Sequence, residues 1–400
     1  MTEPMNTRLP VPLVLCAWGA CLLGACTSEQ VIHANVPAAT LAQQAPAEQR
    51  LLDVAIAVFD PGLSGEEKTD RDSEAYSQIR EAEARYLAYT LRKTLEGTGQ
   101  WGLVRLTPHE DRSVDLLVNA AIVESSGSEL VLDVRVSDAA GRTWFSGRYS
   151  ALASKYAYSD EHFSQKEPFQ AVYTGVANDM LAARDKFASR ELAAIRDVAE
   201  LRFAADLVPA AFGDYLVEDS VGAYSVNSLP AADDPMLLRV RRIRQRDFML
   251  LDALDAYYAR FYRDMKPAYR EWLKSSFEET IELKKLQRSA RNRMGMGAAA
   301  MVAGVAGGVR SDSTAGQAVS VATAAGGAAV FASGVKKYDQ SRIHLDALRE
   351  LNDSFKADLK PKVVEVEGRT ITLTGSAEAQ YSSWRELLRR IYIEERGLPH

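Results

Sequence analysis

The chain has 400 residues, of which 47% are hydrophobic and 26% charged, and its formal net charge is −6. This composition supports about two or three folded domains and excludes a wholly disordered chain. The lack of a basic excess argues against a nucleic-acid partner.

The first residues have the pattern of an export signal. Residues 11–25 are apolar and uncharged, and the run is the length of a signal-peptide core, not of a membrane span. Its translation start is either Met1 or Met5. The run ends Leu23-Gly24-Ala25-Cys26, which resembles the lipobox of bacterial lipoproteins.

The cysteine distribution favours a lipoprotein over a plain signal peptide or a short membrane anchor. The other two cysteines, Cys16 and Cys21, lie inside the apolar run, so cleavage after residue 25 leaves Cys26 as the only thiol. A disulfide within the mature chain is therefore excluded, and we expect a covalent lipid on Cys26. Thr27, not aspartate, follows the cysteine, which favours the outer membrane, on its periplasmic face.

A polar segment, 26–49, predicts a flexible tether between the lipid and the first domain. Residues 50–185 then predict a β-α-β-β-β-β-α domain. Its strands are expected within 51–61, 101–108 and 114–125 and in a hairpin around Asp138–Gly141, and its helices over 74–96 and 167–184.

This order resembles the amino-terminal domain of TolB and the core of CsgG-type secretion lipoproteins. The resemblance rests on VAIAVFD, LEGTGQWGLVRL, VDLLVNAAI and ELVLDVRVSDAAGRTWFSGRYS, and it covers about a third of the chain. It implies a periplasmic binding or assembly module, not a catalytic one.

Residues 186–293 predict a helical region with a break at Pro209, a helix start at Asp233-Asp234-Pro235 and a kink at Pro267. An arginine run, 239–246, is either a solvated helix face or a patch for anionic lipid, and the solvated face is favoured. Aromatic residues at 257–272 favour a core over an interfacial belt.

Residues 294–335 form a Gly/Ala-rich hydrophobic stretch interrupted at 310–314, which predicts a helical hairpin. Such small residues allow close helix contact, and the stretch resembles the glycine-zipper hairpins of outer-membrane lipoproteins. The predicted membrane or oligomer contacts are Gly304, Gly308, Gly326 and Gly327, and the predicted headgroup-facing cations are Arg288, Arg291, Arg293, Lys336 and Lys337. Internal packing and a mobile loop remain alternatives.

A further helix is expected over 336–360, where it could pair with 268–293. Residues 361–400 predict strand, strand and helix, and VEVEGRTITLTGSAEA resembles half of a BON domain, an envelope module associated with phospholipid binding. This unit is too small to fold alone, so we expect it to pack on the middle helices or on a second copy.

The sequence contains no pattern typical of an active site. Its histidines are isolated, no H-E-x-x-H or G-x-S-x-G occurs, and the pair His109-Glu110 is a weak candidate for proton transfer. We therefore predict an α+β, non-enzymatic envelope lipoprotein without a metal or cofactor other than its lipid. Its partners would be membrane lipid, further copies of itself or an envelope complex, and the alternative is an oligomeric pore or secretion subunit.

Overall fold

The computed structural model describes residues 28–30, 38–63, 71–111, 113–158, 167–306, 362–366, 369–373 and 377–394. These residues form an α+β fold, which confirms the predicted class. Cys26 lies outside the described residues, as do 307–361, and with them the second arm of the predicted hairpin and the helix predicted at 336–360.

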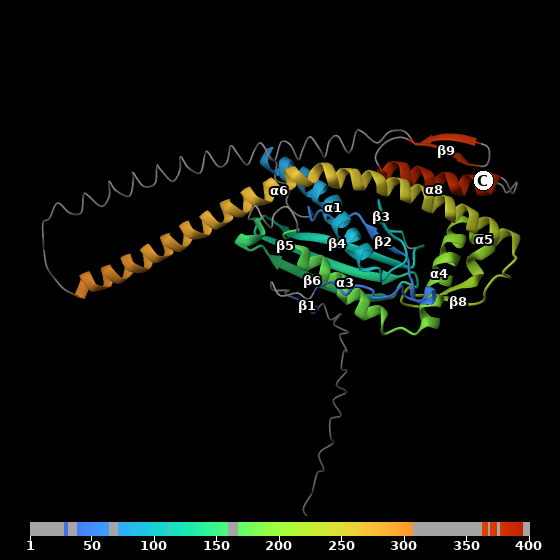
Figure 1. Cartoon of the computed structure of the whole chain (residues 1–400), viewed down its shortest axis with the longest axis horizontal. Coiled ribbons are helices and arrows are strands. Elements are labelled where there is room, and N and C mark those ends of the chain that lie inside the picture. The colour runs from blue at the N-terminus through green and yellow to red at the C-terminus, as the bar shows by residue number, and fades with distance from the viewer. Residues whose placement is uncertain are drawn as a thin grey trace, which may run out of the picture.

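A six-stranded mixed sheet organises the first half of the chain (Figure 1). Its strands are β1 (Ser28–Gln30), β2 (Val54–Ala57), β3 (Val104–Thr107), β4 (Leu116–Ser125), β5 (Glu129–Asp138) and β6 (Thr143–Leu152), in the spatial order β1-β6-β5-β4-β2-β3. β2 runs parallel to β3 and β4, whereas β4, β5 and β6 form an antiparallel meander. The strands predicted from residue 51 onward are all confirmed.

Helices cover one face of this sheet. α1 (Arg71–Thr98) packs over β2 and β3, and α3 (Gln170–Arg184) packs over β5 and β6. Alternation along β4 explains which face is covered, because Leu116 and Val118 enter the main core, whereas Asn119 is half-buried on the opposite face. The structure thus leaves one sheet face without a helical layer among the described residues.

The segment predicted as a flexible tether makes defined contacts in the parts that the structure describes. β1 pairs with β6 from Ser28 to Gln30. The amide of Thr40 donates to Asn178 Oδ1 over 3.0 Å, and the amide of Ala42 donates to the carbonyl of Thr98 over 2.8 Å. A 3-10 helix, η1 (Glu48–Arg50), then leads into the sheet. These hydrogen bonds hold the described parts of the segment to the domain, whereas residues 26, 27 and 31–37 of the predicted tether lie outside the described residues.

The middle of the chain supplies α4 (Ser189–Leu207), the short α5 (Pro209–Phe212) and the long α6 (Pro235–Ala306). Helix α4 ends at the predicted break, since proline lacks the amide that would continue it. The predicted start of α6 is also confirmed: Asp234 Oδ1 accepts from the amides of Met236 and Leu237. Between α5 and α6 lie η3 (Gly213–Tyr215) and a two-stranded hairpin formed by β7 (Leu216–Glu218) and β8 (Tyr224–Val226). The sequence did not predict this hairpin.

Helix α6 continues through Pro267 without ending there. Its aromatic residues Tyr258, Phe261, Tyr262 and Tyr269 are buried, which confirms that they belong to a core. Within the arginine run, Arg241 and Arg242 are exposed, as a solvated face requires, and Arg241 pairs with Glu200, whereas Arg244 is half-buried and donates to the carbonyl of Ser113.

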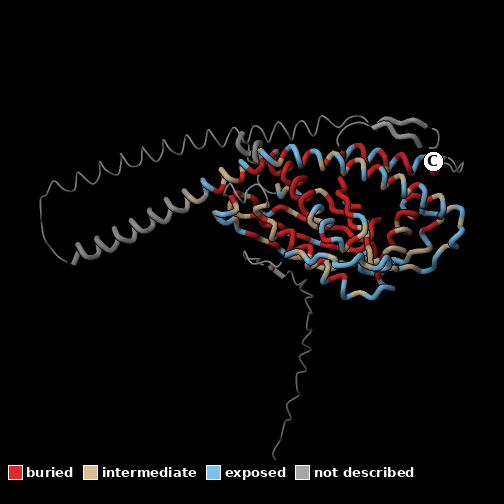
Figure 2. Tube along the Cα trace, viewed as in Figure 1, coloured by how far each residue is buried: buried red, intermediate tan, exposed pale blue. Residues whose placement is uncertain are grey.

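The C-terminal unit consists of β9 (Lys362–Val366), β10 (Arg369–Leu373) and α8 (Ala377–Glu394), as predicted. Helix α8 packs on α6 and α4. One hydrophobic core cluster therefore extends from Leu52 to Tyr392, and it does not divide at residue 185 (Figure 2). The predicted α/β domain and the first part of the helical region are one packed body.

Candidate functional site: a polar groove on the open sheet face

The uncovered sheet face carries two rows of polar side chains. In one row, Asn119 on β4 lies opposite Arg135 on β5, which lies opposite Ser146 on β6. In the next, Asp60 lies beside Ala121, which is followed by Asp133 and Arg148. Side chains alternate across a strand. Each strand therefore contributes one set of alternate positions to the core and presents these polar groups at the other set.

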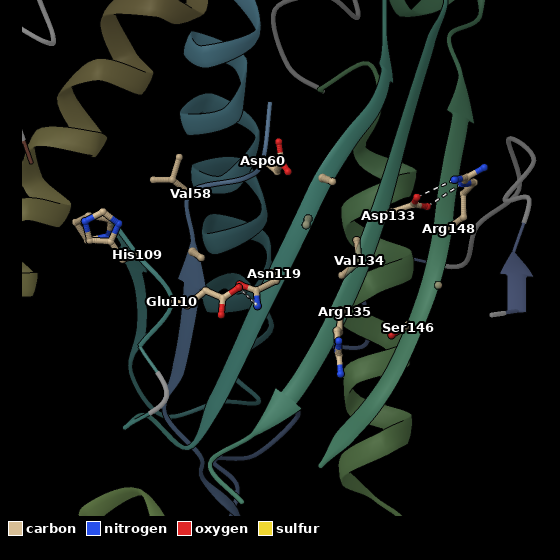
Figure 3. A pocket seen from close by; sticks show the side chains of 15 residues that line it. Val58, Asp60, His109, Glu110, Asn119, Asp133, Val134, Arg135, Ser146 and Arg148 are labelled. Carbon is tan, nitrogen blue, oxygen red and sulfur yellow. Dashed lines mark hydrogen bonds and ion pairs between the residues drawn. The ribbon is translucent and has the colours of Figure 1, made fainter. Parts of the chain in front are cut away.

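These rows line a cavity of about 760 Å³ (Figure 3). Asp133 and Arg148 form a bidentate ion pair, with both N–O distances at 2.7 Å. The guanidinium of Arg135 donates to Thr143 Oγ1 over 2.8 Å, and it has no carboxylate partner among the described residues. Small residues, including Ala57 and Ala121, form the floor between the polar groups.

The loop after β3 forms one wall of this cavity. Glu110 Oε1 accepts a 3.0 Å hydrogen bond from Asn119 Nδ2, which ties the loop to the sheet face (Figure 3). His109 Nε2 lies 3.2 Å from Ser382 Oγ on α8. The predicted pair His109-Glu110 therefore lies at a cavity wall, but each side chain has a separate partner.

Two further cavities adjoin the first and share Glu110 with it. One, of about 630 Å³, is lined by residues of α4, β8 and α8, including Arg202, Tyr224, Arg385 and Arg389. The other, of about 380 Å³, lies between the sheet face and the β7–β8 hairpin. Together they form a polar groove from β6 across the open sheet face to α8. We call this the open-face groove.

Ion pairs neutralise several of the charges along the open-face groove. Arg389 donates to both oxygens of Asp206, at 2.7 and 2.9 Å, and Arg385 also contacts Asp206 at 3.0 Å. Arg202 donates to the carbonyl of Ala139 and lies over the ring of Tyr224, 4.4 Å from its centroid. The groove therefore presents many donors and acceptors, and acidic and basic side chains alternate along it.

A buried network fixes α8 as the far wall. Asp247 on α6 is fully buried, and it accepts hydrogen bonds from Trp384 Nε1 at 3.0 Å and from Arg385 at 3.2 Å. Tyr381 donates to Asp111 at 3.1 Å, which links α8 to the loop after β3. Burial raises the pKa of Asp247 to about 6, although the guanidinium of Arg385 opposes that rise.

A second buried carboxylate lies between α1 and α6. Glu83 is fully buried, and its Oε1 accepts from Ser125 Oγ at 2.6 Å and from Tyr269 at 2.9 Å. Desolvation raises its pKa, and Arg80, 3.7 Å away, opposes the rise. Because the carboxylate and both of its partners are buried, we assign this cluster to the packing of α6 on α1.

The residues singled out from the sequence lie elsewhere. Arg288, Arg291, Arg293 and Gly304 belong to α6, whose backbone alone is described there, whereas Cys26, Gly308, Gly326, Gly327, Lys336 and Lys337 lie outside the described residues. Sequence reasoning missed the groove. The available signal was the polar set at alternate positions, Asn119, Asp133, Arg135 and Arg148, in strands otherwise rich in aliphatic residues.

No helix among the described residues is both long and apolar enough to cross a membrane. Within the same part of the chain, no group of three or more histidine, cysteine, aspartate or glutamate residues is arranged to hold a metal ion.

Comparison with known proteins places the chain in no family: no family model matches it, and no curated protein is significantly similar to it.

Proposed function

We propose that this protein is a lipid-anchored envelope component without enzymatic activity. It is held to the outer membrane through Cys26 and acts as a docking or assembly element. The lipobox-like sequence before Cys26 supports the anchor, and the absence of any other cysteine in the mature chain supports it further. The observation that carries the assembly role is the course of α6.

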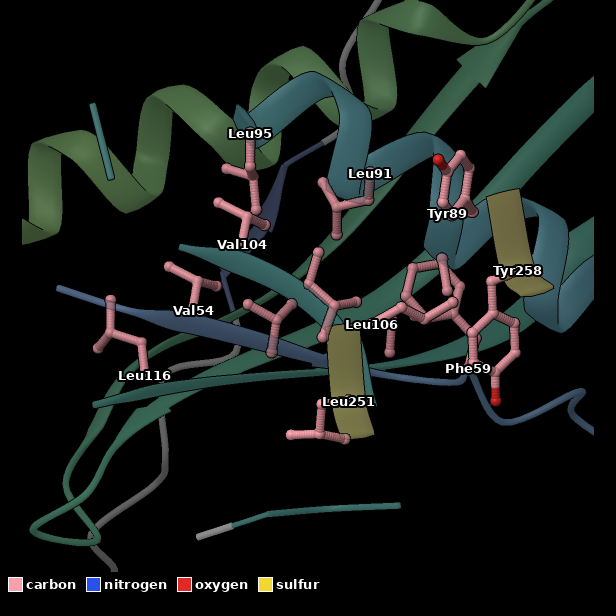
Figure 4. Packing of buried hydrophobic residues seen from close by; sticks show 14 of the residues in the cluster. Val54, Phe59, Tyr89, Leu91, Leu95, Val104, Leu106, Leu116, Leu251 and Tyr258 are labelled. Atoms are coloured by element: carbon pink, nitrogen blue, oxygen red, sulfur yellow. The ribbon is translucent and has the colours of Figure 1, made fainter. Parts of the chain in front are cut away.

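Helix α6 is fixed to the folded body along its first half. Leu251 and Tyr258 of α6 belong to the same main core cluster as Leu106 and Phe59 (Figure 4). Among the α6 residues whose side chains the structure describes, Phe277 is the last one buried in this core, and Ile281 packs partly against it. A helix anchored in this way holds a fixed direction as it leaves the body.

Beyond Ile281, α6 projects from the folded body (Figure 1). The stretch from residue 282 to Ala306 is about 37 Å long at 1.5 Å per residue. Its end, 294–306, is the first arm of the Gly/Ala-rich sequence. Small-residue faces allow helices to approach closely, so a projecting arm of this composition suits contact with further copies or with the membrane.

The anchor is tested by fractionating cells that express the full chain or its Cys26→Ser variant. We expect the natural chain in the outer-membrane fraction and the variant in the soluble periplasmic fraction. A variant that remains in the membrane after a high-salt wash would contradict lipid anchoring at Cys26 and would point to attachment through another segment.

The assembly role is tested by replacing Gly304 and Gly308 together with leucine. We expect the natural lipoprotein to form oligomers in mild detergent and the double variant to be monomeric, because leucine separates the helix backbones. Val302→Leu is the matched control, since valine already occupies that position with a large side chain. A monomeric natural chain would overturn self-assembly, and oligomers that conduct ions in lipid bilayers would replace it with the pore alternative.

A further inference from the structure

The open-face groove has the chemistry of a carbohydrate-binding site. Its walls alternate hydrogen-bond donors and acceptors: the carboxylates of Glu110 and Asp133, the amide of Asn119 and the guanidinium of Arg135. Planar groups of this kind each form two directed hydrogen bonds, which matches the paired hydroxyls on a sugar ring. We propose that this groove binds a neutral oligosaccharide. This inference is independent of the lipid anchor and of the projecting arm.

The mixture of acidic and basic side chains along the groove argues for a neutral ligand. Asp133 is paired with Arg148, and Asp206 is paired with Arg389 and Arg385, so a polyanion or a polycation would have to break existing ion pairs to use these groups. Separating such pairs costs free energy that a charged ligand must recover. Hydroxyl groups, in contrast, donate and accept at once, so they can bridge a carboxylate and a guanidinium without separating them.

Shape and surface composition favour a sugar chain over a peptide. The cavity of about 760 Å³ on the sheet face has the size of a site for a few sugar units, and the adjoining cavity of about 630 Å³ extends it towards α8. The floor offers Ala57 and Ala121, whose methyl groups suit the C–H faces of a pyranose ring but give no deep pocket for a large apolar side chain.

The side chains at the centre of the groove are held in place by hydrogen bonds. The Asn119 amide already donates to Glu110, so its carbonyl oxygen and the second Glu110 oxygen are set at defined positions. Arg135, opposite Asn119 across the β4–β5 ladder, is held by Thr143 and has no carboxylate partner among the described residues. We assign Asn119 and Arg135 to ligand binding, with Glu110 as the acceptor beside them.

The test measures binding of four probes to the full lipidated chain in detergent, by isothermal titration calorimetry. The probes are maltotetraose, chitotetraose, a sulfated heparin tetrasaccharide and the peptide Ala-Glu-Lys-Ala. We expect at least one neutral tetrasaccharide to bind with a Kd between about 10 μM and about 1 mM. Its affinity should change less than about twofold between about 50 mM and about 500 mM salt, because no net charge is screened.

The variants Asn119→Ala and Arg135→Ala should each weaken that binding about tenfold, which corresponds to about 1.4 kcal/mol. Glu96→Gln is the matched control. Glu96 is exposed on α1, which covers the opposite face of the sheet, so this variant should bind like the natural chain. Thermal unfolding of each variant verifies that it is folded, and both groove residues are solvent-accessible, so little change in Tm is expected. Failure of both neutral probes, binding of the peptide or the sulfated probe alone, or affinity unchanged in both variants would overturn the proposal.

Discussion

The amide of Gly127 donates a 3.1 Å hydrogen bond to Ser276 Oγ, which joins the turn between β4 and β5 to helix α6. The carbonyl of the same glycine accepts from Tyr158 at 2.5 Å. A Cβ atom at position 127 would overlap the carbonyl oxygen of Leu273 and the amide nitrogen of Phe277. The turn therefore lies directly on the backbone of α6, close to the place where that helix leaves the folded body.

We expect Gly127→Ala to destabilise the protein by about 2–3 kcal/mol, because neither backbone can move aside without losing its own hydrogen bonds. Gly97→Ala is the matched control. Nothing lies within 4 Å of a Cβ at that position in α1, so alanine should stabilise by about 0.5–1 kcal/mol through its lower backbone entropy. Urea unfolding measures both variants, and equal effects would contradict the close packing of the turn on α6.

We expect Arg385→Ala to lower the free energy of unfolding by about 3 kcal/mol at pH 7.5, because it removes a charged partner from the fully buried Asp247. Arg390→Ala, on the exposed side of α8, is the control. Its pair with Glu386 is open to solvent, so the change should stay within about 0.5 kcal/mol. Chemical denaturation compares the two, and a similar cost for both would show that Asp247 does not hold α8.

Asp247 also predicts a pH dependence of stability. Its pKa in the folded protein, about 6, lies above the ordinary value of 3.8, so the folded state binds the proton more tightly. The stability that this protonation contributes is present at low pH and is lost as the pH rises from about 4 to about 6. Asp247→Asn keeps a neutral group at this position and should not show that loss.

The measured quantity is the difference in unfolding free energy between the natural chain and Asp247→Asn, determined at several pH values. We expect the natural chain to lose up to about 3 kcal/mol of unfolding free energy relative to Asp247→Asn between pH 4 and pH 7. Asp115, whose pKa burial also raises to about 6, is present in both proteins and cancels. A difference that does not vary with pH would contradict the raised pKa of Asp247.

Tyr269→Phe tests the buried cluster around Glu83. The substitution leaves Glu83 with Ser125 as its remaining hydrogen-bond donor at Oε1, so we expect a loss of about 1–2 kcal/mol. Tyr257→Phe, at a half-buried position of the same helix, should cost less than about 0.5 kcal/mol. Thermal unfolding gives both values, and a neutral Tyr269→Phe would show that this hydroxyl does not stabilise the contact between α1 and α6.

Local patterns in the sequence were sufficient to predict most elements of the fold. Alternating residues in 129–138 predicted β5, helical spacing predicted α1, and the Asp-Pro pair at 234–235 predicted the start of α6, because each signal lies within a few adjacent residues. The short hairpin β7–β8 escaped prediction, since three-residue strands carry almost no periodicity. The contacts of residues 38–50 escaped it too, because polar composition does not reveal a docking partner.

The sequence by itself determined most of the elements, the buried faces of the strands and the expectation of a lipid on Cys26, since all of these depend on neighbouring residues. Only the tertiary structure decided that the sheet and the middle helices share one core and that the turn at Gly127 lies on α6. It also decided the open-face groove, which brings Asn119, Arg135 and α8 together across large sequence separations. Such contacts depend on how faces pack, and no local pattern encodes that choice.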